Sequence, residues 1–237
     1  MSKFKAFLKK KDITVTWQRY GIEALGAMAQ GLFCSLLIGT IIKTLGTQLG
    51  VQFITDIGTY AMAVSGPAMA VAIGYALKSP PMVLFSLAAV GWAANAEGGA
   101  GGPLAVLIIA IAAAECGKAV SKETKVDLLV TPGVTILVGV ALAKLIAPPI
   151  GTAANALGLL IIEATNLRPF FMGILVSVIV GVALTLPISS AAICSVLGLT
   201  GLAGGAAVAG CCAQMGGFAV ISFREDGWGG IVSQGRG

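Results

Sequence analysis

Long apolar runs, separated by short polar or glycine- and proline-rich linkers, dominate the pattern of this 237-residue chain. About 20 apolar residues cross the hydrocarbon layer of a membrane as a helix, so each long run predicts at least one membrane element. The pattern predicts an all-α, polytopic integral membrane protein with about six to eight membrane elements, some of them broken or re-entrant. The expected elements cover residues 21–45, 57–77, 81–96, 103–114, 128–146, 151–166 and 173–223.

The run 173–223 is the longest of these and contains no charged residue. It exceeds one crossing, and Pro187, followed by Ser189 and Ser190, interrupts it. We therefore expect two membrane elements joined at residues 187–190. Its second half is rich in glycine and alanine, and the pairs Gly201/Gly205 and Ala206/Gly210 are each four residues apart. This spacing favours tight helix packing, although broken helices of this kind can also line a substrate cavity. Ser189 and Ser190 at the break are then candidate substrate contacts.

Prolines predict two further interruptions. Pro67, in the sequence Ser-Gly-Pro, lies midway along 57–77 and is expected to break that element. Pro148 and Pro149 are expected to end the element 128–146. The short segment 151–166 that follows is then either re-entrant or interfacial.

Composition supports this fold class. The chain is 57% hydrophobic and 11% charged, whereas soluble domains carry about 25% charged residues. Unbroken apolar runs favour helices over a β-barrel, whose strands alternate. There is no histidine, which excludes histidine-based acid–base catalysis and a phosphohistidine on this chain. We expect no catalytic residue, metal or cofactor. The five cysteines are expected to be reduced thiols packed as small hydrophobes, with a soft-metal site at Cys211 and Cys212 as the less favoured alternative.

Basic residues concentrate at the N-terminus, where six of the 15 lie within the first 19 residues. We interpret residues 1–20 as a basic interfacial segment that contacts membrane lipid on the cytoplasmic side, and residues 21–237 as the membrane domain. Nucleic acid is not an expected partner. With a cytoplasmic N-terminus, the loop that holds Lys118, Lys122 and Lys125 is also cytoplasmic if 81–96 and 103–114 cross as a pair.

Glu97 is the sharpest candidate for solute binding, because a carboxylate between an apolar run and a glycine-rich turn usually faces a cavity. Asn95 beside it supplies amide donors and an acceptor, which together with a carboxylate suit a hydroxyl-rich ligand. The alternative is that Glu97 lies in an exposed loop. Gln214 is a weaker candidate, for a ligand or for an interhelical hydrogen bond. Glu115 and Lys118 are expected to form a solvated i,i+3 pair.

Several segments carry a resemblance to a known family: TLPISSAAI (185–193), GGAAVAGCCAQMGGF (204–218), SFREDGWGG (222–230), VSGP (64–67) and NAEGGAGGP (95–103). Together they resemble the membrane component, enzyme IIC, of the bacterial sugar phosphotransferase system, in the branch that includes perfringolysin-regulator-like membrane proteins. The resemblance implies a multi-pass permease of the bacterial plasma membrane. Such a permease binds a sugar and presents it for phosphorylation to a phosphorylated cytoplasmic component, and it is expected to be a homodimer.

The sequence departs from the family pattern in two places. Family members continue past the Trp-Gly-Gly segment, whereas this sequence ends at Gly237, so we expect a truncated or short member. The Gly-Ile-Thr-Glu segment of better-understood members is absent, so Glu97 is not equated with its glutamate. Two other functions stay open: a membrane-embedded regulator or sensor without transport activity, and a scaffold subunit that packs against a larger membrane protein.

Overall fold

A computed structural model describes residues 7, 10–14, 16–124, 126–165, 168–183 and 201–234. Within these residues the chain forms helices and no strand, so the predicted all-α polytopic fold is confirmed. By length and composition, 4 of the described helical stretches can cross a membrane, or up to 5 if a bent pair counts as one. The chain divides into two compact units, Met1–Gly151 and Thr152–Gly237, and each is described by itself.

Unit 1 begins with a continuous helical stretch in which α-helical and π-helical turns alternate. Its elements are η1 (Gln18–Glu23), α2 (Ala24–Leu32), η2 (Phe33–Leu37) and α3 (Ile38–Leu49). The helices α4 (Gln52–Ala63), α5 (Ser65–Ala76), α6 (Pro81–Gly98) and α7 (Gly102–Val120) follow, with the 3-10 turn η3 (Gly99–Gly101) between the last two.

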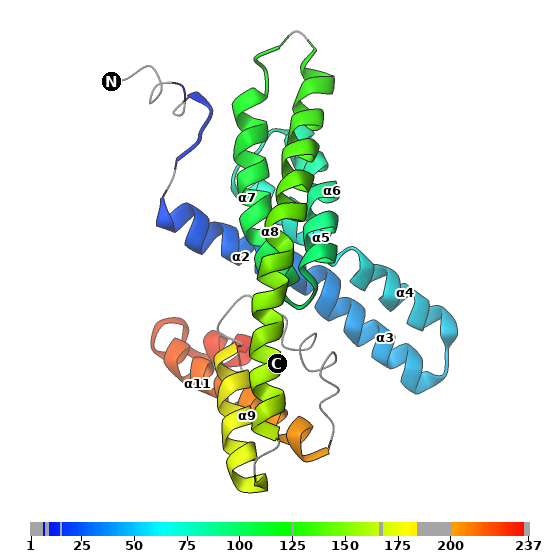
Figure 1. The fold of residues 1–237 in the computed structure, drawn as a ribbon, viewed down its shortest axis with the longest axis vertical. Helices are drawn as coiled ribbons and strands as arrows, with labels where there is room; N and C mark the ends of the chain where they lie inside the picture. The colour runs from blue at the N-terminus through cyan, green and yellow to red at the C-terminus, as the bar shows by residue number, and fades with distance from the viewer. Residues whose placement is uncertain are drawn as a thin grey trace. The chain divides into compact units, whose positions relative to one another are not determined.

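The core of unit 1 lies where α2, α5, α6 and α7 pack together (Figure 1). Ile73 of α5, Leu87 and Val90 of α6 and Ile109 of α7 are fully buried there. Alanine is frequent among the remaining core residues, which allows these helices to approach one another closely. The core therefore fixes the position of α6, which carries Asn95 and Glu97, relative to α2, α5 and α7.

The glycine-rich turn between α6 and α7 reverses the chain. Gly99 has φ +51°, a left-handed conformation that favours glycine, and α7 has Pro103 in its first turn, where a missing N–H costs nothing. The reversal brings α6 and α7 side by side, as expected for two separate membrane elements at 81–96 and 103–114.

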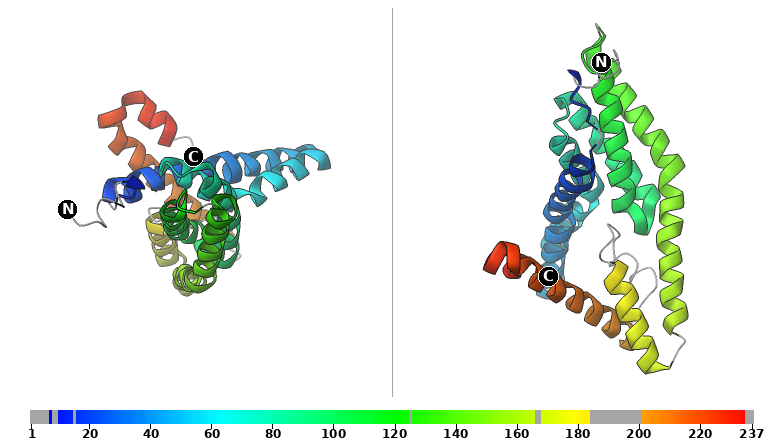
Figure 2. Two further views of the ribbon diagram at one scale, coloured as in Figure 1. Left: turned by 90° about the horizontal axis from the view of Figure 1, so that it is seen from above. Right: turned by 90° about the vertical axis from the view of Figure 1, so that its left-hand side faces the viewer.

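A hairpin of α3 and α4 projects from the rest of unit 1, as Figure 1 and the left view of Figure 2 show. Gly50, with φ +68°, ends α3, and glycines on both helices let the backbones meet. A Cβ atom at Gly39 would lie 2.9 Å from the carbonyl oxygen of Gly58, for example. Most large side chains of the hairpin are exposed apolar groups, as suits a surface in contact with lipid.

Helices α4 and α5 form a bent pair with an angle of 46° between them. The bend lies at Val64, whose φ of −93° and ψ of 13° are not helical, and Pro67 occupies the first turn of α5. Without an N–H, Pro67 cannot bond the carbonyl of Ala63, the last residue of α4. The structure thus places the interruption three residues before the proline.

Helix α8 (Asp127–Thr165) continues through Pro148 and Pro149. The prediction that these prolines end the element 128–146 is therefore wrong, whereas the placement of 151–166 relative to the membrane stays a prediction. The packing of unit 1 supplies the reason: a Cβ atom at Gly101 would lie 2.9 Å from the carbonyl oxygen of Ile150, so α8 lies directly on the glycine-rich turn. Such tertiary contacts stabilise a helix through the prolines, as neighbouring elements commonly do in membrane proteins.

Unit 2 contains the rest of α8, helix α9 (Pro169–Ala183) and helix α11 (Gly201–Gln234). Helices α9 and α11 pack on each other, with Gly210 of α11 against the backbone of Ser177 of α9. Gly227, with φ +59° and ψ −140°, kinks α11 near its end. The predicted break at Pro187, with Ser189 and Ser190, lies outside the described residues.

Candidate functional site

Glu97 forms an ion pair with Lys144 of α8, with 3.0 Å between the carboxylate and the ammonium group. Glu97 lies in the last turn of α6, where the negative end of the helix dipole disfavours a carboxylate, and the lysine compensates for this. The Glu97 side chain is 39% exposed and that of Lys144 is 70% exposed, so a polar ligand can reach both.

Asn95 lies two residues before Glu97 and therefore points in a different direction from α6. It is half-buried where the first turns of α5 and α7 meet α6. A Cβ atom at Gly102 would lie 2.5 Å from the side-chain oxygen of Asn95, and one at Gly66 would lie 2.7 Å from its Cβ atom. Among the described residues, no hydrogen bond joins Asn95 to Glu97: Asn95 packs against the first turns of α5 and α7, whereas Glu97 pairs with Lys144 of α8.

Lys144 was not among the residues that the sequence singled out. A signal was present, because it is the only charged residue between positions 128 and 162. An isolated lysine in an apolar membrane helix usually faces a partner or a cavity. The partner carboxylate is 47 positions earlier in the chain, a separation that no helical periodicity reveals.

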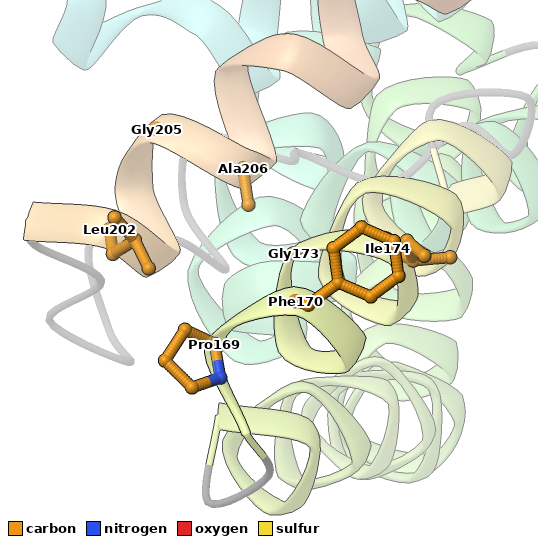
Figure 3. Close-up of a pocket in the computed structure, with 7 residues that line it drawn as sticks. All are labelled: Pro169, Phe170, Gly173, Ile174, Leu202, Gly205 and Ala206. Carbon is orange, nitrogen blue, oxygen red and sulfur yellow. The ribbon is translucent and has the colours of Figure 1, made fainter.

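Gln214 of α11 is half-buried in unit 2 and faces α9: a Cβ atom at Gly181 would lie 4.0 Å from its side-chain oxygen. A cavity of about 550 Å³ also lies between α9 and α11 (Figure 3), but Gln214 does not line it. Its lining is apolar or glycine, at Pro169, Phe170, Gly173, Ile174, Leu202, Gly205 and Ala206. None of the described residues that line this cavity offers a polar side chain to a sugar.

A cluster of charged and polar side chains, made of Asp12, Arg19, Tyr20, Glu115 and Lys118, lies at the end of unit 1 where α5 and α7 terminate, and its two cations Arg19 and Lys118 are buried. Lys118 is 2% exposed and lies 3.1 Å from the Glu115 carboxylate, which is 14% exposed. The expectation of a solvated pair is therefore wrong, because the N-terminal segment covers it. Tyr20 donates a hydrogen bond of 3.0 Å to the same carboxylate.

Arg19 joins the N-terminal segment to this cluster. Its guanidinium donates to the Asp12 carboxylate at 2.8 Å and to the Thr14 hydroxyl at 2.7 Å. The hydrogen bond from Arg19 lowers the pKa of Asp12 below its ordinary value, since it stabilises the ionised carboxylate. The cluster therefore holds Asp12, Thr14 and Arg19 against the rest of unit 1, and it includes neither Glu97 nor Asn95.

Comparison with known proteins identifies the family. A family model described as "Phosphotransferase system, EIIC" matches residues 22–237. No curated protein and no solved structure matches the chain. The family match covers nearly the whole sequence and agrees with the apolar helices of both units. The chain therefore belongs to the EIIC family of the phosphotransferase system and is a multi-pass membrane component of that system.

Proposed function

We propose that this chain binds a sugar-like solute at Glu97, Lys144 and Asn95 and translocates it across the bacterial plasma membrane. A separate cytoplasmic component then phosphorylates the sugar. The ion pair between Glu97 and Lys144 carries the proposal, because it places two partly exposed, opposite charges side by side at the glycine-rich end of α6. A carboxylate accepts hydrogen bonds from sugar hydroxyls, an ammonium group donates them, and an amide does both.

The bent pair α4–α5 supplies the element that moves. Interrupted helices mark the substrate sites of many transporters, where irregular backbone lines a cavity. The first turn of α5 approaches Asn95 through Gly66, so movement of α5 about the bend at Val64 changes the surroundings of the site. Ser189, Ser190 and Gln214 stay predicted ligand contacts. The N-terminus is predicted to be cytoplasmic.

The remaining partners follow from the family and from the exposed surface. Phosphoryl-carrier components of the cytoplasm supply the phosphoryl group, and this chain carries no phosphorylated residue in our proposal. The exposed apolar side chains of α3 and α4 suit lipid, and we propose that a second copy of the chain forms a homodimer in the membrane. Chemical cross-linking in native membranes tests the dimer.

Thermal unfolding of the detergent-purified protein with a panel of free sugars tests the binding site. A ligand that binds only the folded state raises its stability by about 2.7 kcal/mol at a hundredfold excess over the dissociation constant. We expect one sugar to stabilise the parent protein and not Glu97→Gln or Asn95→Ala. Glu163→Gln, which neutralises an exposed carboxylate elsewhere on α8, is the control and keeps the response.

Uptake into proteoliposomes then separates the permease from the regulator. Uptake of the stabilising sugar supports the permease, whereas binding without uptake supports the regulator. A folded protein that responds to no sugar in the panel contradicts the proposed site.

A further inference from the structure

A second cavity lies at the end of unit 1 where three chain segments meet. It has a polar lining and a volume of about 260 Å³. Its walls are formed by residues 10–12, by residues of the connection between α5 and α6, and by residues of the connection between α7 and α8. Two carboxylates, Asp12 and Glu123, line it. Five lysines do so as well, Lys10, Lys11, Lys78, Lys118 and Lys122, which leaves a net charge of +3. We call it the basic cavity.

Lys78 stands where the backbone favours glycine. Helix α5 ends in a Schellman motif: the N–H of Lys78 donates to the carbonyl of Tyr75, and the N–H of Ser79 donates to that of Gly74, both at 2.9 Å. The residue at the position of Lys78 in this motif is left-handed and is usually glycine. Lys78 has φ +55°, a conformation that is strained for a long side chain.

Lys122 stands at a second glycine position. The N–H of Glu123 donates to the carbonyl of Val120 at 3.2 Å, which closes a four-residue turn after α7. Ser121 has φ −56° and ψ 133°, and Lys122 has φ +61°. These are the angles of a type II turn, whose third residue requires a positive φ and is therefore normally glycine.

The strained residues gather at this one cavity. Within the described part of the chain, the non-glycine residues with positive φ are Asp12, Lys78 and Lys122, and all three line it. Strained backbone of this kind clusters at ligand-binding sites, where the side chain is needed at that position. Packing does not explain the two lysines, because both are exposed.

The two carboxylates of the basic cavity form ion pairs with cations other than Lys78 and Lys122. The Asp12 carboxylate is occupied by Arg19 at 2.8 Å, and the Glu123 carboxylate by Lys11 at 2.6 Å and Lys10 at 3.6 Å. The structure shows no ion pair for Lys78 or Lys122 with any residue it describes. Two ammonium groups from different loops, neither held in an ion pair with a described residue, therefore line the same cavity.

Lys118 lines the basic cavity and holds the chain segments around it in place. Its ammonium group donates to the carbonyl oxygens of Asp12 at 2.9 Å and of Leu77 at 3.1 Å, and so ties two walls to α7. The site is thus organised before any ligand binds, which lowers the cost of binding. We propose that the basic cavity binds the phosphate group of an anionic ligand, with Lys78 and Lys122 as its principal contacts.

Two ligands share this chemistry: a soluble sugar phosphate and the headgroup of an anionic lipid. Only the first rests on the proposed function. Thermal unfolding in neutral detergent at constant ionic strength tests the soluble source with inorganic phosphate and with glucose 6-phosphate. Added phosphatidylglycerol, compared with phosphatidylcholine, tests the lipid source. Free sugar is left out of this experiment. A negative result for the proposed sugar site at Glu97 therefore does not change what this experiment says about the basic cavity.

Lys78→Gly and Lys122→Gly are the informative variants, because glycine relieves the backbone strain while it removes the charge. We expect each variant without ligand to unfold at the same temperature as the parent or higher, and its affinity for phosphate to fall about five- to tenfold. Glu123→Gln removes a competing carboxylate and is expected to raise the affinity by a similar factor. Lys43→Gln, an exposed lysine of α3 outside the cavity, is the control and leaves it unchanged.

Each result decides the proposal. Stabilisation by both soluble phosphates that the glycine variants lose supports a sugar-phosphate site. Stabilisation by phosphatidylglycerol alone, lost in the same variants, supports the cavity with lipid as its ligand. The proposal is overturned if no phosphate compound stabilises the parent, or if Lys43→Gln weakens binding as much as the two glycine variants.

Discussion

Arg19 and Lys118 donate hydrogen bonds to the same acceptor, the carbonyl oxygen of Leu77, at 2.7 Å and 3.1 Å. Leu77 follows directly on the last turn of α5, where unpaired carbonyls carry the negative end of the helix dipole. Two buried cations converge there, one from the N-terminal segment and one from α7. The arrangement joins three parts of unit 1 and holds one end of the helix whose other end approaches Asn95.

Removing the Lys118 ammonium group tests this arrangement. Lys118→Met keeps much of the side-chain volume but leaves the largely buried Glu115 carboxylate without its cationic partner. We expect a loss of about 3–5 kcal/mol in the free energy of unfolding, since breaking a buried pair from one side leaves an uncompensated charge. Denaturant unfolding in detergent measures it.

The control for this prediction is Lys43→Met, which removes an exposed lysine and should change stability by no more than about 0.5 kcal/mol. The double variant Glu115→Gln with Lys118→Met should lose less than the sum of the two single variants, because it no longer buries a lone charge. Equal effects of Lys118→Met and Lys43→Met would contradict a stabilising role for the cluster.

Lowering the pH should weaken the ion pair between Asp12 and Arg19 in the N-terminal segment. The pKa of Asp12 is held below its ordinary value of 3.8 by Arg19, so the pair stabilises the folded state at pH values above 3.8. This contribution is lost as pH falls through the lowered pKa. Because the Asp12 side chain is 54% exposed, solvent screens the pair, and we expect about 1 kcal/mol or less.

Unfolding of the parent and of Asp12→Asn between pH 7 and pH 3 measures this contribution, because the other carboxylates titrate in both proteins. The parent should be the more stable protein by a constant amount down to about pH 5. The difference should shrink below the ordinary pKa. A difference that persists unchanged at pH 3 would show that it does not arise from ionised Asp12.

The sequence predicted the fold class, the separate helices α6 and α7, and the interruption between α4 and α5, because apolar runs and prolines are local signals. It did not predict the path of α8 through Pro148 and Pro149. There, contacts with the turn around Gly101 override the local preference of proline. Burial of Lys118 was missed for a related reason, since the segment that covers it is more than 100 positions away.

In the candidate site, too, the sequence predicted residues that carry a local signal and missed a contact between distant parts of the chain. Glu97 was singled out because a carboxylate beside an apolar run is locally unusual, and so was Asn95 next to it. Lys144 carries a comparable local signal, but its pairing with Glu97 depends on how α6 and α8 pack. A single sequence contains no information on that contact, so the partner had to come from the structure.

The contact between Gly66 of α5 and Gly91 of α6 is expected to be needed for the sugar site. A Cβ atom at Gly66 would lie 2.5 Å from the carbonyl oxygen of Gly91, and the reverse approach is equally close. Gly91→Ala should therefore push α6 away from α5, at a cost of about 1–3 kcal/mol. Because Asn95 lies one turn further along α6, sugar-dependent stabilisation should fall as well.

Gly133→Ala on α8 is the matched control for this change, since a Cβ atom there meets nothing within 4 Å. Alanine favours a helix interior over glycine by about 1 kcal/mol, so this variant should be neutral or more stable. Should Gly91→Ala keep the full response to sugar while losing stability, the α5–α6 contact would be structural only.

Substitution by alanine should have opposite effects on stability at Gly210 and at Gly205 of α11. Both belong to the small-residue pattern of this helix, but a Cβ atom at Gly210 would lie 2.9 Å from the Cα atom of Ser177 and closer still to its carbonyl oxygen. A Cβ atom at Gly205 would meet nothing within 4 Å. Only Gly210 therefore lies in the close contact between α9 and α11.

Gly210→Ala should separate α9 from α11 and destabilise unit 2 by about 1–3 kcal/mol, because backbone atoms cannot yield as a flexible side chain does. Gly205→Ala should be neutral or raise stability by up to about 1 kcal/mol through helix propensity. Protease protection of α9 and α11 in detergent, measured over a denaturant series, reports on this unit. Similar protection of the two variants would contradict the contact at Ser177, whereas loss in Gly210→Ala alone would show that one glycine of the pattern, and not glycine content in general, joins the two helices.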